Sequence, residues 1–346
     1  MAYMLTAAGT SASHLTRFAL PMGLAVFIGA LAAPSAAEVD PSRLVDAMEG
    51  AGGKFAGYRR AGAKGVCVEA EFAGSAEGRA LSVSSAFSGQ RIPVTARFSV
   101  GGGNPMAPDN TRSQRNMALQ FNLPNGEVWQ MGNISSPIFG ASTPEQFLGR
   151  LESFAPDPST GKPDPAKVKA FARANPEVLL QAKYFASQPV PASYVAVNYW
   201  GVHAFAFVDA WGKKQFGKWI FEPVGGTRGL SDEEAKEKGA NFLIDELRQR
   251  VASGSAEFDF NLQLAEQGDA INSAITQLPE GRPKVTLGQL RLKSVSPDSG
   301  GGCLTITYNP MVLPKGVEAS ADPMLTARAA PYAVSLGRRL GEGAKQ

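Results

Sequence analysis

The chain has 346 residues, and its 34 lysines and arginines exceed its 31 aspartates and glutamates by three, so the formal net charge is +3. Acidic and basic residues are interspersed, and without a basic stripe we exclude nucleic acid as a partner. The two cysteines, Cys67 and Cys303, form no C-x-x-C motif, which argues against a zinc site.

Residues 1–37 have the pattern of a secretory signal peptide. Arg17 precedes the apolar run FALPMGLAVFIGALAAPSAA, which is short for a membrane span and ends in small residues. We expect cleavage after Ala37, no stable membrane span afterwards, and a periplasmic or secreted location. The alternative is a single N-terminal membrane anchor. The remaining residues 38–346 are expected to form one domain, in which His203 is the only histidine.

Export would place Cys67 and Cys303 in an oxidising compartment. A disulfide between them is one outcome, and two buried free thiols are the other. The sequence gives no distance between them.

The first half of this domain is mostly strand-like. The segments GVCVEAEFAG (65–74) and PVTARFSVG (93–101) are typical of strands, and residues 116–134 contain two strands joined by a Pro-Asn-Gly turn. A helix is predicted over 142–154, capped by Ser142 or Thr143, with Pro144 at its first position. Helical sequence continues over about 165–187.

The second half adds a hairpin over 194–224, followed by a single amphipathic helix over 231–253 that is capped by Ser231. Strands are predicted at 256–266, 284–295 and 303–316. The last helix, 322–343, contains Pro331, which predicts a kink because proline lacks an N–H and clashes with the carbonyl of the residue four positions earlier.

These elements predict the fold class. About eight strands, joined mostly by hairpins, pair in an antiparallel manner and readily close into a barrel, which removes exposed edges. We therefore predict an α+β domain built on an antiparallel eight-stranded β-barrel with surrounding helices.

Common catalytic sets are excluded by the residues present. The stretch YRRAGAKGVC (58–67) lacks the spacing and the Ser or Thr of a phosphate-binding loop. A catalytic triad needs a histidine, and His203 lies in the alternating segment GVHAFAFV, which is typical of a satisfied core histidine. Arg328 and Tyr332 stand four residues apart on one helical face. A guanidinium there favours the phenolate, a ligand of ferric haem.

Seven segments resemble the haem catalases, and specifically the catalase-related peroxidases. In chain order they are AKGVCVEAEF (63–72), PVTARFSVGGGNPMAPDN (93–110), RNMALQF (115–121), MGNISSPIFGASTPEQF (131–147), PDPSTGKPDP (156–165), WGVHAFAFV (200–208) and DPMLTARAAPYAVSLGRR (322–339). The resemblance implies an antiparallel eight-stranded barrel with buried haem b. It also implies a peroxide substrate and an electron donor.

The resemblance assigns haem-binding roles to four residues. Tyr332 is implied to be the axial ligand of the haem iron, with Arg328 beside it. Arg97 and Arg59 are implied to contact the haem propionates, where guanidinium geometry suits a carboxylate.

The peroxide side of the haem departs from the family. Phe139 resembles the aromatic residue of this side, Asn133 is the candidate amide that positions peroxide, and Ser99 matches the residue that orients the catalytic histidine. That histidine is the acid/base of the family, and here its position is Gly62. His203 matches a structural position of the barrel.

The sequence thus predicts an exported haem-dependent peroxidase that acts on hydrogen or organic peroxides, with activity weakened by the missing histidine. Water in the vacated space could relay the proton, and Gly62→His is expected to raise the rate. One alternative is a catalytically inactive haem-binding protein. The other is a barrel that has lost haem and binds another apolar ligand.

Overall fold

The computed structural model describes residues 39–297 and 301–343, which belong to one compact unit. The predicted signal peptide, residues 1–37, lies outside the described residues. In the described part, no helix combines the length and apolarity that crossing a membrane requires.

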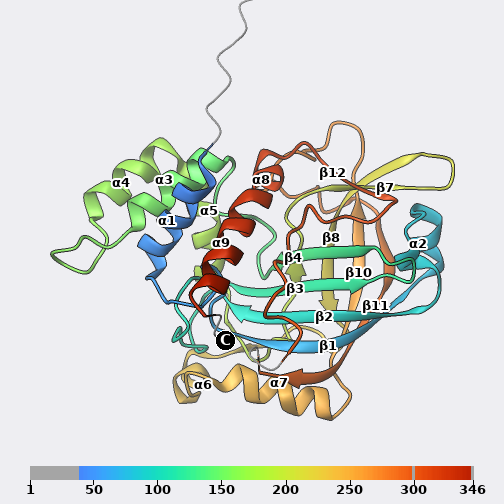
Figure 1. Cartoon of the computed structure of the whole chain (residues 1–346), viewed down its shortest axis with the longest axis horizontal. Coiled ribbons are helices and arrows are strands. Elements are labelled where there is room, and N and C mark those ends of the chain that lie inside the picture. The colour runs from blue at the N-terminus through green and yellow to red at the C-terminus, as the bar shows by residue number, and fades with distance from the viewer. Residues whose placement is uncertain (1–38, 298–300, 344–346) are drawn as a thin grey trace, which may run out of the picture. The chain divides into compact units, whose positions relative to one another are not determined.

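Eight antiparallel strands form a closed barrel, as the sequence predicts. Each strand pairs with the next in the order β10-β11-β1-β2-β3-β4-β6-β8, and pairing of β8 with β10 closes the ring (Figure 1). The strands are β1 (Gly65–Gly74), β2 (Arg91–Val100), β3 (Arg115–Asn122), β4 (Val128–Ile134), β6 (Tyr199–Trp200), β8 (Lys214–Pro223), β10 (Glu257–Leu264) and β11 (Lys284–Ser296).

Short strands supplement the barrel. Strands β7 (Phe205–Val208) and β12 (Val317–Ala319) extend the sheet from β8, while β5 (Val190–Pro191) and β9 (Gly229–Leu230) form a separate pair. The β3–β4 hairpin has the predicted turn, in which Gly126 has a φ of +84° that a glycine adopts without strain.

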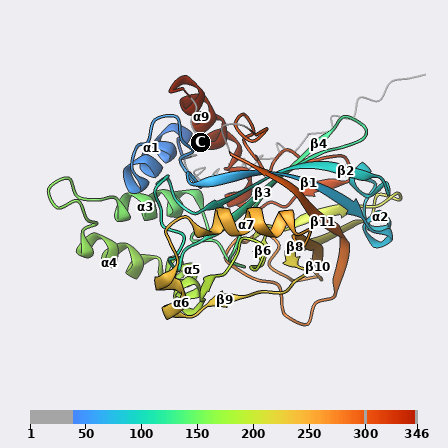
Figure 2. The same cartoon turned by 90° about the horizontal axis from the view of Figure 1, so that it is seen from below.

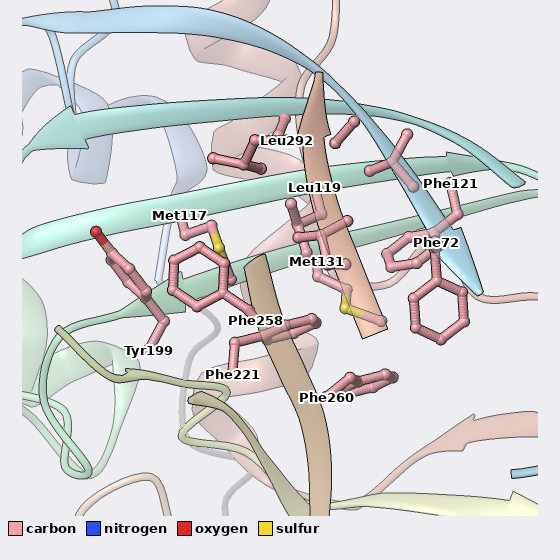
Figure 3. Close-up of a cluster of buried hydrophobic side chains, with 14 of the residues drawn as sticks. Phe72, Met117, Leu119, Phe121, Met131, Tyr199, Phe221, Phe258, Phe260 and Leu292 are labelled. Carbon is pink, nitrogen blue, oxygen red and sulfur yellow. The ribbon is translucent and has the colours of Figure 1, made fainter. Parts of the chain in front are cut away.

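The barrel interior is filled by aromatic and aliphatic side chains. Every second residue of a strand points inward, and Figure 3 shows Met117, Leu119 and Phe121 of β3 in one cluster with Phe72 of β1 and with Phe258 and Phe260 of β10. Large aromatic side chains bury the most apolar area per residue, so this cluster contributes strongly to stability.

Helices surround the barrel. Figure 1 shows α1, α3, α4, α5 and α9 together beside it, and Figure 2 shows α7 along the strands, where it contacts β11. The helices are α1 (Pro41–Gly52), α2 (Ala76–Leu81), α3 (Pro144–Phe154), α4 (Pro165–Ala174), α5 (Leu179–Ser187), α6 (Asp232–Glu237), α7 (Phe242–Ala252), α8 (Pro323–Thr326) and α9 (Ala329–Gly341), with 3-10 turns at Ser85–Phe87 and Pro176–Val178.

Three predicted elements are wrong. The helix predicted over 231–253 is two helices, α6 and α7, because the chain leaves the helix at Lys238, just before Gly239, a poor helix former. The segment 303–316 forms turns instead of a strand, and Tyr308 within it has a φ of +55°. The C-terminal helix is broken into α8 and α9 at Ala327 and Arg328.

The kink predicted at Pro331 is replaced by this break. Pro331 is the third residue of α9. An N–H in the first turn of a helix has no intrahelical acceptor, so proline loses nothing there. Starting a new helix at Ala329 therefore accommodates Pro331 and still presents Tyr332 one residue later.

Candidate functional site

A cavity of about 990 Å³ lies between the barrel and the helices α1, α3, α5 and α9. This volume is at the upper end of the range for small-molecule and cofactor sites. All of the predicted site residues contribute atoms to its wall, namely Arg59, Gly62, Arg97, Ser99, Asn133, Phe139, Arg328 and Tyr332. Phe139 packs against Phe147 of α3, with the two ring centroids 5.3 Å apart.

The outer face of β2, β3 and β4 forms the floor of this cavity. Ser99 is directly opposite Asn116, and Asn116 is opposite Ile134, so the three side chains share one face of the sheet. Arg97 and Gly132 lie on the same face, two residues along their strands from Ser99 and Ile134. This row predicts which residues can meet a ligand.

Asn133 belongs to the other face of β4. Its Oδ1 accepts a hydrogen bond from Trp219 Nε1 at 2.7 Å, and its Nδ2 donates to the carbonyl oxygen of Met117 at 3.0 Å, both inside the barrel. The candidate role of Asn133 as the amide that positions peroxide is therefore corrected, because the next residue, Ile134, is the one that faces the cavity.

Tyr332 begins a hydrogen-bonded chain of four side chains, which we call the tyrosine chain. Arg328 Nη2 donates to the phenol oxygen of Tyr332. The other nitrogen, Nη1, lies 3.3 Å from His203 Nε2, and His203 Nδ1 lies 2.8 Å from Asp322 Oδ2. A Cβ on Gly132 would lie only 2.9 Å from Arg328 Nη2, so the absent side chain leaves room for the guanidinium.

The charges along the tyrosine chain define its protonation. Burial lowers the pKa of the His203 imidazole, so the ring is neutral at pH 7. Burial alone would raise the pKa of Asp322, but the hydrogen bond from His203, the backbone N–H of Met324 and the nearby charge of Lys218 together lower it. His203 thus donates through Nδ1 to a carboxylate and accepts at Nε2 from Arg328.

His203 is a buried, satisfied histidine, as predicted, with only 3% of its surface exposed. The alternating sequence GVHAFAFV predicts a strand at this position, with a structural role for the histidine. It lies instead in the loop between β6 and β7, and its contact with Arg328 makes it part of the site.

Three buried arginines line the cavity near Tyr332. Arg97 Nη1 donates to the carbonyl of Gly62 at 2.7 Å, and the guanidinium passes over Gly65, where a Cβ would lie 2.5 Å from its Nη2. Arg59 Nη2 donates to the carbonyl of Cys303 at 2.7 Å. The third is Arg339 of α9, which the sequence analysis did not assign.

A disulfide holds the loop that supports two of these arginines. Cys67 of β1 is bonded to Cys303, with the two Cα atoms 5.7 Å apart. Besides Arg59, the loop receives a hydrogen bond from Arg339 Nη2 to the carbonyl of Leu304, at 2.8 Å. Of the two outcomes left open by the sequence, the structure has the disulfide.

Gly62 stands next to a second hydrogen-bonded chain, which we call the amide chain. A Cβ on Gly62 would lie 2.6 Å from Ser99 Oγ and 3.3 Å from Asn116 Nδ2. Asn116 Nδ2 donates to Ser99 Oγ at 3.1 Å, and Gln114 Nε2 donates to Asn116 Oδ1 at 2.6 Å. Gln181 of α5 donates to Gln114 Oε1 at 3.3 Å.

Every member of the amide chain is neutral. Its residues are Ser99, Asn116, Gln114 and Gln181, none of which ionises between pH 2 and 12 in water. The last three are not among the residues predicted from the sequence. Alternation along β3 could have placed Gln114 and Asn116 on the cavity face, but nothing in the sequence brings α5 to this point.

The remaining polar residues of 58–67 have structural partners. Arg60 pairs with Glu49 at 2.8 Å and with Glu342 at 2.7 Å, and Lys64 pairs with Asp109 at 2.7 Å in a buried position. These pairs leave the stretch no role in binding phosphate.

Comparison with known proteins gives one consistent result. The family model described as Catalase matches residues 56–346. The chain is 40% identical over 305 residues to the catalase-related peroxidase of Synechococcus elongatus, covering 88% of this chain and 90% of that protein. It is 30% identical to the catalase-related peroxidase of Mycolicibacterium paratuberculosis, with 87% and 95% covered.

Solved catalase structures share the fold. A fungal catalase superimposes with a TM-score of 0.75 at 21% identity, covering 84% of this chain. A bacterial catalase gives 0.73 at 23% identity. The chain spans 60% and 58% of the lengths of these two proteins.

Proposed function

Because the chain belongs to the catalase family, as an oxidoreductase related to the catalase-related peroxidases, we propose that it uses haem b to consume hydrogen peroxide or organic peroxides. The observation that carries the proposal is the tyrosine chain at the wall of a cofactor-sized cavity. A phenolate oxygen is a ligand that haem iron accepts.

The residues of the cavity fit haem b. Tyr332 would hold the iron, with its oxygen oriented by Arg328. Arg59, Arg97 and Arg339 supply cationic donors for the two propionate carboxylates. The haem would supply the redox chemistry with peroxide, and the chain's own residues would bind the haem and orient the substrate.

We expect proton transfer to be slow in this protein. The amide chain next to Gly62 contains hydrogen-bond donors and acceptors but no group that takes up a proton near neutral pH. General acid–base catalysis contributes about 10²- to 10⁴-fold to a rate. We therefore propose slow peroxide turnover, in which water or the substrate itself carries the proton.

A second candidate follows from the same observation. A cavity that binds haem through Tyr332 but has only neutral amides beside Gly62 also suits an inactive haem-binding protein. The two candidates differ in turnover, not in haem binding.

One experiment separates them. The purified protein is loaded with haem, its Soret absorption is recorded, and consumption of hydrogen peroxide and of an organic hydroperoxide is measured per haem with an electron donor present. A Soret band with slow, haem-dependent turnover supports the peroxidase. A Soret band without turnover supports the inactive haem-binding protein, and a protein that takes up no haem contradicts both.

We also propose export with cleavage after Ala37. The disulfide supports it, since disulfides persist in oxidising compartments such as the periplasm. Mass spectrometry of the periplasmic fraction tests this, and a full-length species retained in the membrane would support the anchor instead.

A further inference from the structure

The cavity wall is rich in arginine. Of the described residues that line it, seven are arginines and none is Asp or Glu: Arg59, Arg60, Arg97, Arg112, Arg150, Arg328 and Arg339. Such a wall attracts anions, because a desolvated guanidinium gains most from a charged acceptor. Haem propionates account for only part of this set.

Arg150 differs from the other six. Each of the others donates to a carboxylate, a carbonyl, a hydroxyl or the His203 ring, whereas Arg150 has no hydrogen-bond acceptor among the residues that the structure describes. Its guanidinium lies over the ring of Phe154, with the guanidinium carbon 5.8 Å from the ring centroid. Burial lowers the pKa of Arg150, but an arginine stays charged.

Arg150 also stands at the end of the amide chain. A Cβ on Gly140 would lie 2.8 Å from Gln181 Oε1 and 3.0 Å from Arg150 Nη1, so these two side chains converge over Gly140. Polar atoms therefore run from Gly62 through Asn116 and Gln181 to an unpaired cation. Each of these polar groups can form a hydrogen bond with the polar end of a ligand.

Another part of the wall is apolar. It consists of side chains from α1, α3, α5 and α9, namely Leu44, Met48, Phe147, Leu151, Phe185 and Leu336. An apolar wall beside one unpaired guanidinium suits a molecule with a carboxylate and an alkyl chain. Hydrogen peroxide uses neither feature.

We propose that Arg150 binds the carboxylate of an organic substrate, so that the cavity takes peroxides that carry an alkyl chain and a carboxylate. The inference rests on the proposed function for the peroxide group. The carboxylate site does not depend on the proposed function, because carboxylate binding needs no turnover.

The test is binding of octanoate to the haem-loaded protein, measured by isothermal titration calorimetry, with 1-octanol as the uncharged probe. Octanoate should bind more tightly than octanol. Arg150→Gln should lower the affinity for octanoate by about 10- to 100-fold, the range for losing a hydrogen bond to a charged group. Arg150→Lys should retain part of the affinity.

A matched control is Arg112→Gln. Arg112 lines the same cavity, but its guanidinium already donates to Asp232 at 2.5 Å and to the carbonyl of Gln188 at 3.0 Å. This variant should leave octanoate affinity nearly unchanged. Equal binding of octanol and octanoate, or an equal loss in Arg112→Gln and Arg150→Gln, would overturn the proposal.

Two further readouts separate substrate binding from other roles. Haem content and folding are measured for each variant first, and loss of haem in Arg150→Gln would assign Arg150 to the cofactor and overturn the proposal. With a carboxylated alkyl hydroperoxide, Arg150→Gln should raise KM more than it lowers kcat. Its methyl ester and hydrogen peroxide should show no such increase. If peroxide turnover is absent while octanoate still depends on Arg150, the proposed function fails but the carboxylate site stands.

Discussion

The tyrosine chain and the amide chain reach the same cavity with opposite chemistry. The first runs from Tyr332 through Arg328 and His203 to the carboxylate of Asp322, so all four of its side chains are titratable groups. The second runs from Ser99 to Gln181 through neutral amides. Both chains are continuous series of hydrogen bonds, so they differ in their titratable groups and not in how completely their members are hydrogen-bonded. If the cavity binds haem as we propose, the tyrosine chain supplies the group that holds the iron, whereas the amide chain supplies no group that takes up a proton near neutral pH.

Tyr332→Phe removes the phenol oxygen and keeps the ring, which should abolish haem retention or change the ligand spectrum. This is the largest effect we expect, because no other described side chain in the cavity is placed as Tyr332 is, with Arg328 donating to its oxygen. The measurement is haem content and the absorption spectrum after gel filtration.

The control for this variant is Tyr308→Phe. Tyr308 lines the same cavity, but its hydroxyl lies 3.0 Å from Cys303 Sγ. It should retain haem. A haem-loaded Tyr332→Phe protein with an unchanged spectrum would refute the role of Tyr332.

Asn116→Asp would give the amide chain a titratable group. The carboxylate can still accept from Gln114 Nε2 and from Ser99 Oγ–H, so the local hydrogen bonds survive the change. We expect peroxide turnover per haem to rise by about 10- to 100-fold, within the range for general acid–base catalysis. The pH profile should gain an ionisation that the parent lacks.

Gln120→Glu controls for charge alone, since Gln120 lies on the same face of β3, four residues away and outside the cavity wall. It should leave turnover unchanged. If Asn116→Asp also has no effect, the amide chain is not where the proton is needed.

Gly62→His should not raise peroxide turnover, although the family resemblance predicts that it does. Gly62 has a φ of +63°, a conformation that costs a residue with a Cβ about 1–2 kcal/mol. Its Cβ would also lie 2.6 Å from Ser99 Oγ. We therefore expect lower stability and no gain in rate, measured by denaturant unfolding and steady-state turnover.

Gly62→Ala separates the effect of the Cβ from that of the imidazole, because it adds the Cβ alone. Similar destabilisation in both variants would assign the cost to the backbone and to Ser99. A stable, faster Gly62→His protein would contradict this reading and support the prediction from sequence.

These contrasts also explain which parts could be predicted from the sequence. Strand alternation, turn residues and the Arg328–Tyr332 spacing are local patterns, and they gave the barrel and the tyrosine end of the site. The cavity face of β4 could not be predicted, because placing Asn133 or Ile134 there depends on a one-residue register that the sequence leaves free. The segment 303–316 was misread because its conformation depends on contacts far away in the chain, namely the bond to Cys67 and the hydrogen bonds from Arg59 and Arg339.

The smallest effect we predict is a pH dependence of stability that comes from His203. Burial lowers the pKa of the imidazole, Arg328 and Lys218 lower it further, and the Asp322 carboxylate opposes them. The unfolded chain keeps the usual histidine value near 6.5. Above pH 6.5 both states are neutral and nothing changes. Below it the unfolded state binds the proton more readily, so stability falls with decreasing pH until the folded pKa is reached, by at most about 1.4 kcal/mol per pH unit.

Denaturant unfolding between pH 5 and 8 measures this slope, and His203→Gln should flatten it below pH 6.5. His203 is the only histidine after residue 37, which makes the assignment direct. Lys218, whose pKa burial lowers to about 8, titrates in a higher window and is distinguishable. A protonated imidazole cannot accept a hydrogen bond from Arg328, so the haem spectrum should shift only at the lower pH where the folded protein itself binds the proton, below the range in which stability falls. If the variant keeps the slope of the parent, His203 is not the group that titrates, and the tyrosine chain is less sensitive to charge than its connections indicate.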